Sequence, residues 1–300
     1  MAEKPELEKD GSRAPGKVSV LRWIGFLAAD YLSASLVATL FIGPLDSLSL
    51  GEEWSWLPST LSNFLTFALL FFFAVLYLQL ICKMSLRALL FGAEGSPDWA
   101  QAAKIILVYL VGYVVSTLIS SRFGAELELN TIGPIPIFVN LLVVASLTWM
   151  QTTWEELVFR GIFLRWSCGE KIAPTLRCVI AGLVSSLLFM WLHGSNPEVL
   201  SQSGIDVAVA FSIYFLAGAS LYFFDVAFGD AMAGCAVHWI NNFVGFALIN
   251  QVGTVVVTGA LVIDHTPVAA AGMLVYTAIC YIPVYLYIAY LAKKGALPRR

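Results

Sequence analysis

The sequence predicts an all-α fold, a polytopic transmembrane helix bundle, and three observations support this: composition, long apolar runs and the placement of basic residues. Only 12% of the 300 residues are charged and 59% are apolar, whereas a soluble domain is about a quarter charged. Uncharged stretches of about 18 residues or more recur, and each can cross the ~30 Å hydrocarbon core as a helix. This composition excludes a cytosolic enzyme, a secreted disulfide scaffold and a disordered chain. The runs are continuous rather than alternating, which also argues against a porin-like barrel.

Apolar runs, read against turn and charged residues, predict eight spans in one transmembrane domain at residues 22–292. We expect the spans at residues 22–44, 58–82, 103–121, 133–166, 176–193, 206–224, 231–250 and 268–292. The Gly-rich apolar segment 251–263 is left outside this count. Residues 1–21 are expected to form a polar cytosolic tail, and residues 293–300 a basic cytosolic tail.

The basic residues predict the orientation. Fifteen of the 17 Lys and Arg residues lie before the first span, between the second and third, between the fourth and fifth, or after the eighth. Arg122 lies on the other side, and Arg160 lies within a span. Because basic loops remain in the cytoplasm, we expect both termini there, which requires an even number of spans. We expect an integral protein of a bacterial inner (plasma) membrane.

A charged group within the hydrocarbon costs several kcal/mol unless it is paired or hydrated, so each one is a functional hypothesis. The ionisable residues that we place at membrane depth are Asp30, Glu155, Glu156, Arg160, His193 and His238. Asp30 has no visible partner, and we expect it to stay hydrated near the interface without a functional role. The other five belong to three short motifs in the fourth, fifth and seventh spans.

The fourth span contains an EExxxR motif, formed by Glu155, Glu156 and Arg160. Adjacent glutamates point about 100° apart on a helix, so the two have different partners. Glu156 and Arg160 lie four residues apart, in the order that favours a helical ion pair. The fourth and fifth spans form a hairpin centred near Pro174, which brings Glu155 and His193 to a similar depth.

The fifth span ends with an FxxxH motif, Phe189 to His193, and the seventh contains an HxxxN motif, His238 to Asn242. Together with EExxxR, in this order on successive membrane helices, these motifs resemble the CPBP family of intramembrane glutamic proteases. That family includes the type II CAAX prenyl endopeptidases and the bacteriocin-processing, or Abi, proteins. The resemblance covers about residues 130–250, and the N-terminal third is similar only in topology.

The resemblance implies an endopeptidase that hydrolyses a peptide bond inside the membrane. Carried over to this chain, Glu155 and His193 would activate a water molecule as general base, and His238 and Asn242 would form the oxyanion hole. The supporting residues would be Glu156, Arg160 and Phe189. The expected partners are membrane lipid and a peptide or protein substrate, with a lipidated C-terminus in the case of CAAX processing.

A catalytic metal is also considered, because glutamate and histidine are zinc ligands and such proteins are sometimes classed as metalloendopeptidases. The HExxH helix of zincins is absent, and Arg160 accounts for Glu156. We therefore expect no cofactor. The net charge of −3 includes no excess of basic residues, so no nucleic acid partner is expected.

Two other functions remain open at this point. The chain could be a catalytically silent membrane scaffold or a bacteriocin-immunity protein, which retains the motifs without the reaction. It could also be a transporter that uses the buried charges. Against a transporter, the two halves show no repeat and no paired broken helices. The substrate is not determined by the sequence.

Overall fold

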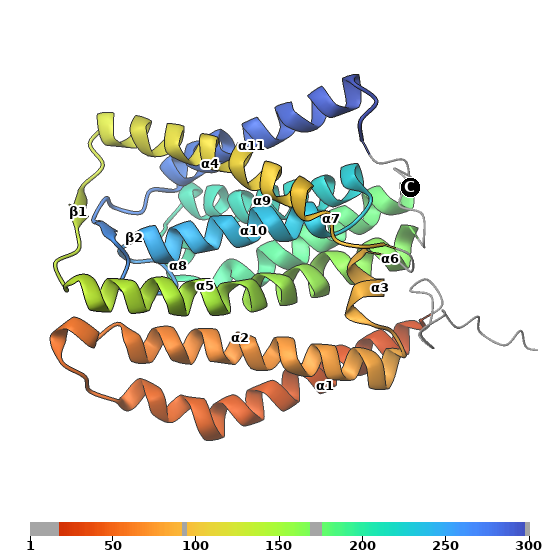
Figure 1. Ribbon diagram of the computed structural model, residues 1–300, viewed down its shortest axis with the longest axis horizontal. Coiled ribbons are helices and arrows are strands. Elements are labelled where there is room, and N and C mark those ends of the chain that lie inside the picture. The colour runs from red at the N-terminus through yellow and green to blue at the C-terminus, as the bar shows by residue number, and fades with distance from the viewer. Residues whose placement is uncertain (1–17, 92–94, 169–175, 298–300) are drawn as a thin grey trace, which may run out of the picture.

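The computed structural model describes residues 18–91, 95–168 and 176–297, and it shows a bundle of long helices (Figure 1). The long helices are α1 (Val20–Val37), α2 (Leu57–Tyr77), α4 (Trp99–Arg122), α5 (Pro134–Glu156), α7 (Leu176–Leu192), α9 (Ile205–Phe228), α10 (Met232–Phe243) and α11 (Ala270–Lys293). Three short helices are α3 (Leu86–Phe91), α6 (Ile162–Cys168) and α8 (Pro197–Leu200). Most of the predicted tail 1–21, and the end of the tail 293–300, lie outside the described residues.

Single π-helical turns extend four of the helices. They are Ala38–Ile42, Leu78–Cys82, Leu157–Gly161 and Val244–Leu248. Three 3₁₀ turns, at Gly43–Ser47, Glu52–Trp54 and His193–Ser195, precede α2 or follow α7.

Seven helical segments are long and apolar enough to cross a membrane. They cover residues 20–47, 52–82, 99–122, 134–165, 176–195, 205–228 and 270–293. Each corresponds to one of the eight predicted spans, so seven of the eight have a helix long and apolar enough to span a membrane, as expected for an integral membrane protein.

The segment predicted as a further span, residues 231–250, forms a shorter helix. Helix α10 and the π-helical turn after it together extend from Met232 to Leu248. This segment is shorter than the ~20 residues that a full crossing requires. The backbone N–H of Ala231 donates to the carbonyl of Leu90 in α3, with an N–O distance of 3.0 Å. Helix α10 therefore begins next to the end of α3 and lies inside the bundle, packed on α4, α5 and α9 (Figure 1).

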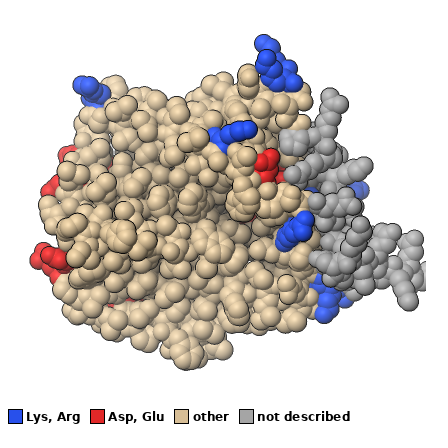
Figure 2. All heavy atoms as spheres, viewed as in Figure 1, with Lys and Arg blue, Asp and Glu red and all other residues tan. Residues whose placement is uncertain are grey.

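The first and last helices of the described chain begin and end at the same end of the bundle (Figure 1). When α10 is counted with the seven longer segments, the chain runs along the bundle an even number of times. Helix α10 reverses the direction of the chain although it is too short for a full crossing. Most of the charged side chains visible in Figure 2 lie toward the two ends, and the middle of that face is uncharged. Which end faces the cytoplasm stays a prediction.

A small three-stranded sheet was not predicted. Strands β1 (Leu127–Leu129), β2 (Ile249–Gln251) and β3 (Val262–Asp264) have the order β1-β3-β2, with β3 antiparallel to β1 and parallel to β2. Each strand has three residues and pairs with a distant segment, so no local alternation of polar and apolar residues marks it. The sheet covers the end of the bundle opposite the termini (Figure 1).

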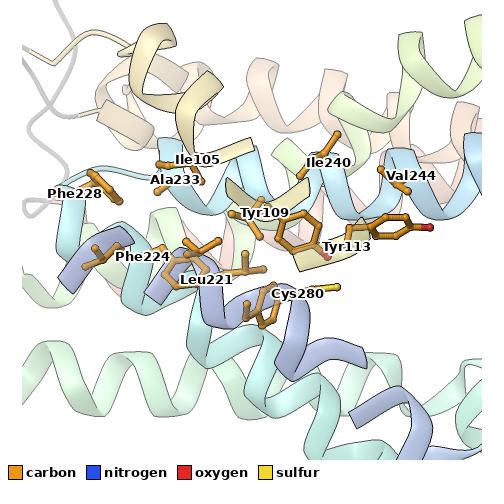
Figure 3. Close-up of a cluster of buried hydrophobic side chains, with 14 residues drawn as sticks. Ile105, Tyr109, Tyr113, Leu221, Phe224, Phe228, Ala233, Ile240, Val244 and Cys280 are labelled. Atoms are coloured by element: carbon orange, nitrogen blue, oxygen red, sulfur yellow. The ribbon is translucent and has the colours of Figure 1, made fainter. Parts of the chain in front are cut away.

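The largest core cluster lies where α4, α9, α10 and α11 meet (Figure 3). Its fully or nearly fully buried members include Ile105, Tyr109, Leu221, Phe224, Val237 and Cys280. This packing holds α10 against its neighbours and so determines where the polar residues of α10 point.

Candidate active site

The EExxxR motif spans a change in helix geometry. Helix α5 ends at Glu156 and continues as the π-helical turn Leu157–Gly161. The hydroxyl of Ser185 on α7 donates to the carbonyl of Phe159 within this turn, and so provides a partner for an irregular backbone in a buried place. A π-helical turn inside an α-helix is often found at a functional site.

Glu155 lies between two histidines. Its Oε2 is 3.8 Å from Nε2 of His193 and 3.7 Å from Nε2 of His238. Glu155 is 4% exposed and His238 6%, whereas the side chain of His193 is 21% exposed. The predicted proximity of Glu155 and His193 is confirmed, and the structure adds His238 as a second neighbour of the same carboxylate oxygen.

The other ring nitrogen of each histidine has a partner that accepts a hydrogen bond. Nδ1 of His193 lies 2.7 Å from the carbonyl oxygen of Phe189, and Nδ1 of His238 lies 2.6 Å from Oε1 of Glu156. A carbonyl or carboxylate oxygen can only accept, so each Nδ1 carries the proton. In a neutral ring the Nε2 atom that faces Glu155 is then an acceptor, and in a doubly protonated ring it is a donor.

The predicted ion pair between Glu156 and Arg160 is confirmed. Nη1 of Arg160 is 3.1 Å from Oε1 of Glu156, and both side chains are fully buried. The guanidinium carbon also lies 4.3 Å from the ring centroid of Phe189. The centroid of the Phe189 ring also lies 4.1 Å from that of His193 and 6.0 Å from that of His238. Phe189 is thus the apolar side chain shared by the cation and both histidines.

A second group of polar side chains next to His193, formed by Tyr214, Asn196 and Glu198, was not predicted. The ring of Tyr214 on α9 stacks on the imidazole of His193, with centroids 4.6 Å apart and planes at 25°. The Tyr214 hydroxyl donates to Oε1 of Glu198, and Nδ2 of Asn196 lies 3.1 Å from both oxygens. Glu198 is only 5% exposed. Asn196 and Glu198 lie between the predicted spans 176–193 and 206–224. Their closeness to His193 in the sequence is the signal that could have identified them.

Asn242 is half-buried and is not in polar contact with the cluster. Its Oδ1 accepts a hydrogen bond from Nδ2 of Asn241, at 3.0 Å, and Asn241 in turn accepts from the hydroxyl of Tyr109 at 2.6 Å. Within residues 18–91, 95–168 and 176–297, no hydrogen bond joins Asn242 to Glu155 or His238. It lies on the same helix as His238, one turn further along.

Two of the buried aspartates, Asp225 and Asp30, have partners on other helices. Asp225 on α9 is fully buried, and its Oδ1 accepts from the backbone N–H of Gly234 at 2.7 Å. Asp30 is 1% exposed and accepts from Nε1 of Trp154 at 2.8 Å. The prediction that Asp30 stays hydrated is therefore wrong, since its side chain is buried and bonded to Trp154 of α5. Asp225 was missed because it directly follows the predicted end of a span.

No three His, Cys, Asp or Glu side chains are arranged to hold a metal ion in the part of the chain that the structure describes. A cavity of about 380 Å³ lies apart from the histidines, between α2 and residues 255–257. Its polar lining comes mainly from Ser59, Ser62, Asn63 and Thr66.

Residues 134–244 match the family model described as type II CAAX prenyl endopeptidase Rce1-like. The matched segment begins with α5 and ends one residue after α10. It therefore contains all three sequence motifs and excludes α1 to α4 and α11. No curated protein and no solved structure matches the chain.

Proposed function

Because residues 134–244 form a domain of the Rce1-like type II CAAX prenyl endopeptidase family, we propose that this chain is an intramembrane endopeptidase. The supporting observation is the position of Glu155, whose Oε2 lies within 3.8 Å of the Nε2 atoms of two histidines inside a bundle of apolar helices. The substrate is a peptide or protein, and its lipidated C-terminus would enter from the surrounding lipid.

Glu155 and His193 act together as the general base. Oε2 of Glu155 and Nε2 of His193 both accept hydrogen bonds, and at 3.8 Å they are too far apart to bond directly. A water molecule that donates to one or both of them is oriented for attack. Glu155 takes a proton as the water oxygen bonds to the carbonyl carbon of the scissile peptide. The same proton is then available for the leaving amine when the C–N bond breaks.

His238 and Asn242 stabilise the oxyanion of the tetrahedral intermediate. Oδ1 of Asn242 is already used by Asn241, so its Nδ2 amide is the group that can donate. A protonated His238 donates through Nε2, and the carboxylate of Glu156, 2.6 Å from Nδ1, compensates its positive charge. Such donors act most strongly where bulk water is excluded, as at these buried positions.

Access to the site is from the side of His193, whose side chain is more exposed than those of Glu155 and His238. Nearby apolar residues on α7, Trp191 and Leu192, are 69% and 50% exposed and would contact lipid or a lipidated substrate. We further propose that the chain resides in a bacterial inner membrane with both termini in the cytoplasm, and that the reaction needs no cofactor.

The experiment that tests this proposal does not require the substrate to be identified beforehand. Membranes that contain equal amounts of wild type, Glu155→Gln or Glu128→Gln are compared for new peptide termini by mass spectrometry. Glu128 is an exposed glutamate on β1 whose side chain is 69% accessible, so Glu128→Gln is the matched control. We expect a set of termini that wild type and Glu128→Gln produce and Glu155→Gln does not.

The opposite result would replace the proposal. If all three membranes yield the same termini while a cellular phenotype still requires the protein, a silent scaffold or immunity protein is the better assignment. If flux of a charged solute into liposomes depends on the protein and the termini do not, the transporter is the better assignment.

A further inference from the structure

A third buried carboxylate, Asp225, lies next to the Glu156 carboxylate. A Cβ atom placed on Gly234 would lie 2.7 and 2.9 Å from the two oxygens of Asp225 and 3.0 Å from Oε2 of Glu156. The two carboxylates therefore face each other across the bare backbone of Gly234. Both side chains are fully buried, so neither is hydrated by bulk water.

The local turn explains how these groups meet. Helix α9 ends at Phe228 and is followed by Gly229, whose φ of +76° is a left-handed conformation that favours glycine. Its N–H donates to the backbone carbonyl of Asp225 at 2.8 Å. The chain then reverses into α10, which brings the N–H of Gly234 to Oδ1 of Asp225 at 2.7 Å. Any residue larger than glycine at position 234 would push the carboxylates apart.

Each carboxylate has one oxygen with partners and one without. Oε1 of Glu156 accepts from Arg160 and His238, and Oδ1 of Asp225 accepts from Gly234. Oε2 of Glu156 and Oδ2 of Asp225 have no hydrogen-bond partner among the described residues. Two unpaired acceptors that face the same point in a buried site cannot satisfy each other unless a proton is present.

The groups around Asp225 include more acidic than basic side chains. The titratable and charged groups that face it are Glu156 and Arg160 on one side, Cys235 on α10, and Asp230 in the turn between α9 and α10. Arg160 is the only cation in this set, and it already pairs with Glu156. Two carboxylates that approach one point in a buried site favour the retention of one proton between them.

We propose that Asp225 is a further positioning residue of the active site, and that it shares one proton with Glu156. The proton lies between Oδ2 of Asp225 and Oε2 of Glu156 and gives both oxygens a partner. It fixes the Glu156 carboxylate so that Oε1 holds Nδ1 of His238, which orients Nε2 toward the reacting centre. The catalytic meaning of this contact depends on the proposed function, whereas the shared proton does not.

The test uses the full chain, purified in detergent, as wild type, Asp225→Asn and Asp225→Leu. Asparagine keeps the acceptor for Gly234 and offers an N–H to Glu156, so it imitates the protonated acid. Leucine offers neither group. With a substrate found by the termini comparison, we expect Asp225→Asn to keep kcat within about threefold, and Asp225→Leu to lower it by about tenfold or more.

An infrared difference spectrum at neutral pH provides a readout that does not depend on activity. Subtracting the Asp225→Asn spectrum from that of wild type should leave the carbonyl band of one protonated carboxyl group. Protonated acids elsewhere, such as a protonated Asp30, cancel in this difference.

Two results would overturn the proposal. One is an Asp225→Asn variant that folds but is as inactive as Asp225→Leu, because the ionised carboxylate would then be required. The other is a difference spectrum without a protonated carboxyl band. If no form of the protein cleaves any substrate, the proposed function fails, and the infrared band still decides whether the proton is shared.

Discussion

Nδ1 of His238 lies 2.6 Å from Oε1 of Glu156, the same oxygen that Nη1 of Arg160 approaches to 3.1 Å. Glu156 therefore does more than neutralise the arginine, because its carboxylate also orients the histidine. The result is a row of polar side chains through the bundle, in which His238 lies between Glu156 and Glu155, and Glu155 faces His193.

Replacing Asn242 tests the oxyanion hole. Loss of one oxyanion donor lowers kcat by about 10²–10³, so we expect a fall of this size in Asn242→Ala with little change in KM. Steady-state cleavage of an identified substrate measures both constants. Asn63→Ala on α2, which lines the separate cavity, is the control and should keep wild-type activity. An Asn242→Ala effect confined to KM would contradict the assignment.

Tyr214 is expected to hold the His193 ring in position. Tyr214→Phe keeps the stacked ring but loses the hydroxyl that bonds to Glu198, and we expect kcat to fall by less than about fivefold. Tyr214→Ala loses the stacking as well, and kcat should fall by about tenfold or more. Equal losses in both variants would show that the hydroxyl, and not the ring, is the important group.

Removing one partner of the buried Glu156–Arg160 pair should strongly lower the stability of the protein. Arg160→Met leaves Glu156 buried without its cation, and the free energy of unfolding should fall by about 3–5 kcal/mol. The double variant Glu156→Leu/Arg160→Met has no unpaired charge and should recover part of this loss. Thermal unfolding in detergent provides the comparison. Additive losses in the double variant would contradict the pairing.

The hydrogen bond between Trp154 and Asp30 is expected to stabilise the packing of α1 next to the candidate site. Trp154→Phe removes the N–H that lies 2.8 Å from Oδ2 of Asp30, and a buried oxygen left without a donor costs about 1–3 kcal/mol. Adding Asp30→Leu should restore stability, measured as the unfolding temperature. Trp149→Phe, at a 42% exposed position, is the matched control and should change it little.

Removing metal ions should leave activity unchanged. In the proposed mechanism, Glu155 and His193 accept the proton of the attacking water, so no step requires a metal-bound hydroxide. The measurement is cleavage after dialysis against a chelator, compared with an untreated sample. Activity that disappears on dialysis and returns with Zn²⁺ would instead identify a metalloendopeptidase.

The sequence by itself predicted the class of protein and the local contacts of the candidate site. Seven apolar runs became seven helices of membrane-spanning length, because only a helix satisfies its own backbone within lipid. Spacing of four residues within one helix was enough to predict the Glu156–Arg160 pair, since that contact is local. The hairpin of two adjacent spans was enough to predict that His193 and Glu155 lie at a similar depth.

Only the tertiary structure decided which side chains meet across helices that are distant in the chain. Helix α10 packs on α4, α5 and α9. In this orientation His238 lies close to both glutamates, whereas no hydrogen bond among the described residues joins Asn242 to either. Asp225 and Asp30 gained partners in the same way, from Gly234 and Trp154. Such contacts depend on the packing and rotation of whole helices, which the periodicity of a single segment does not contain.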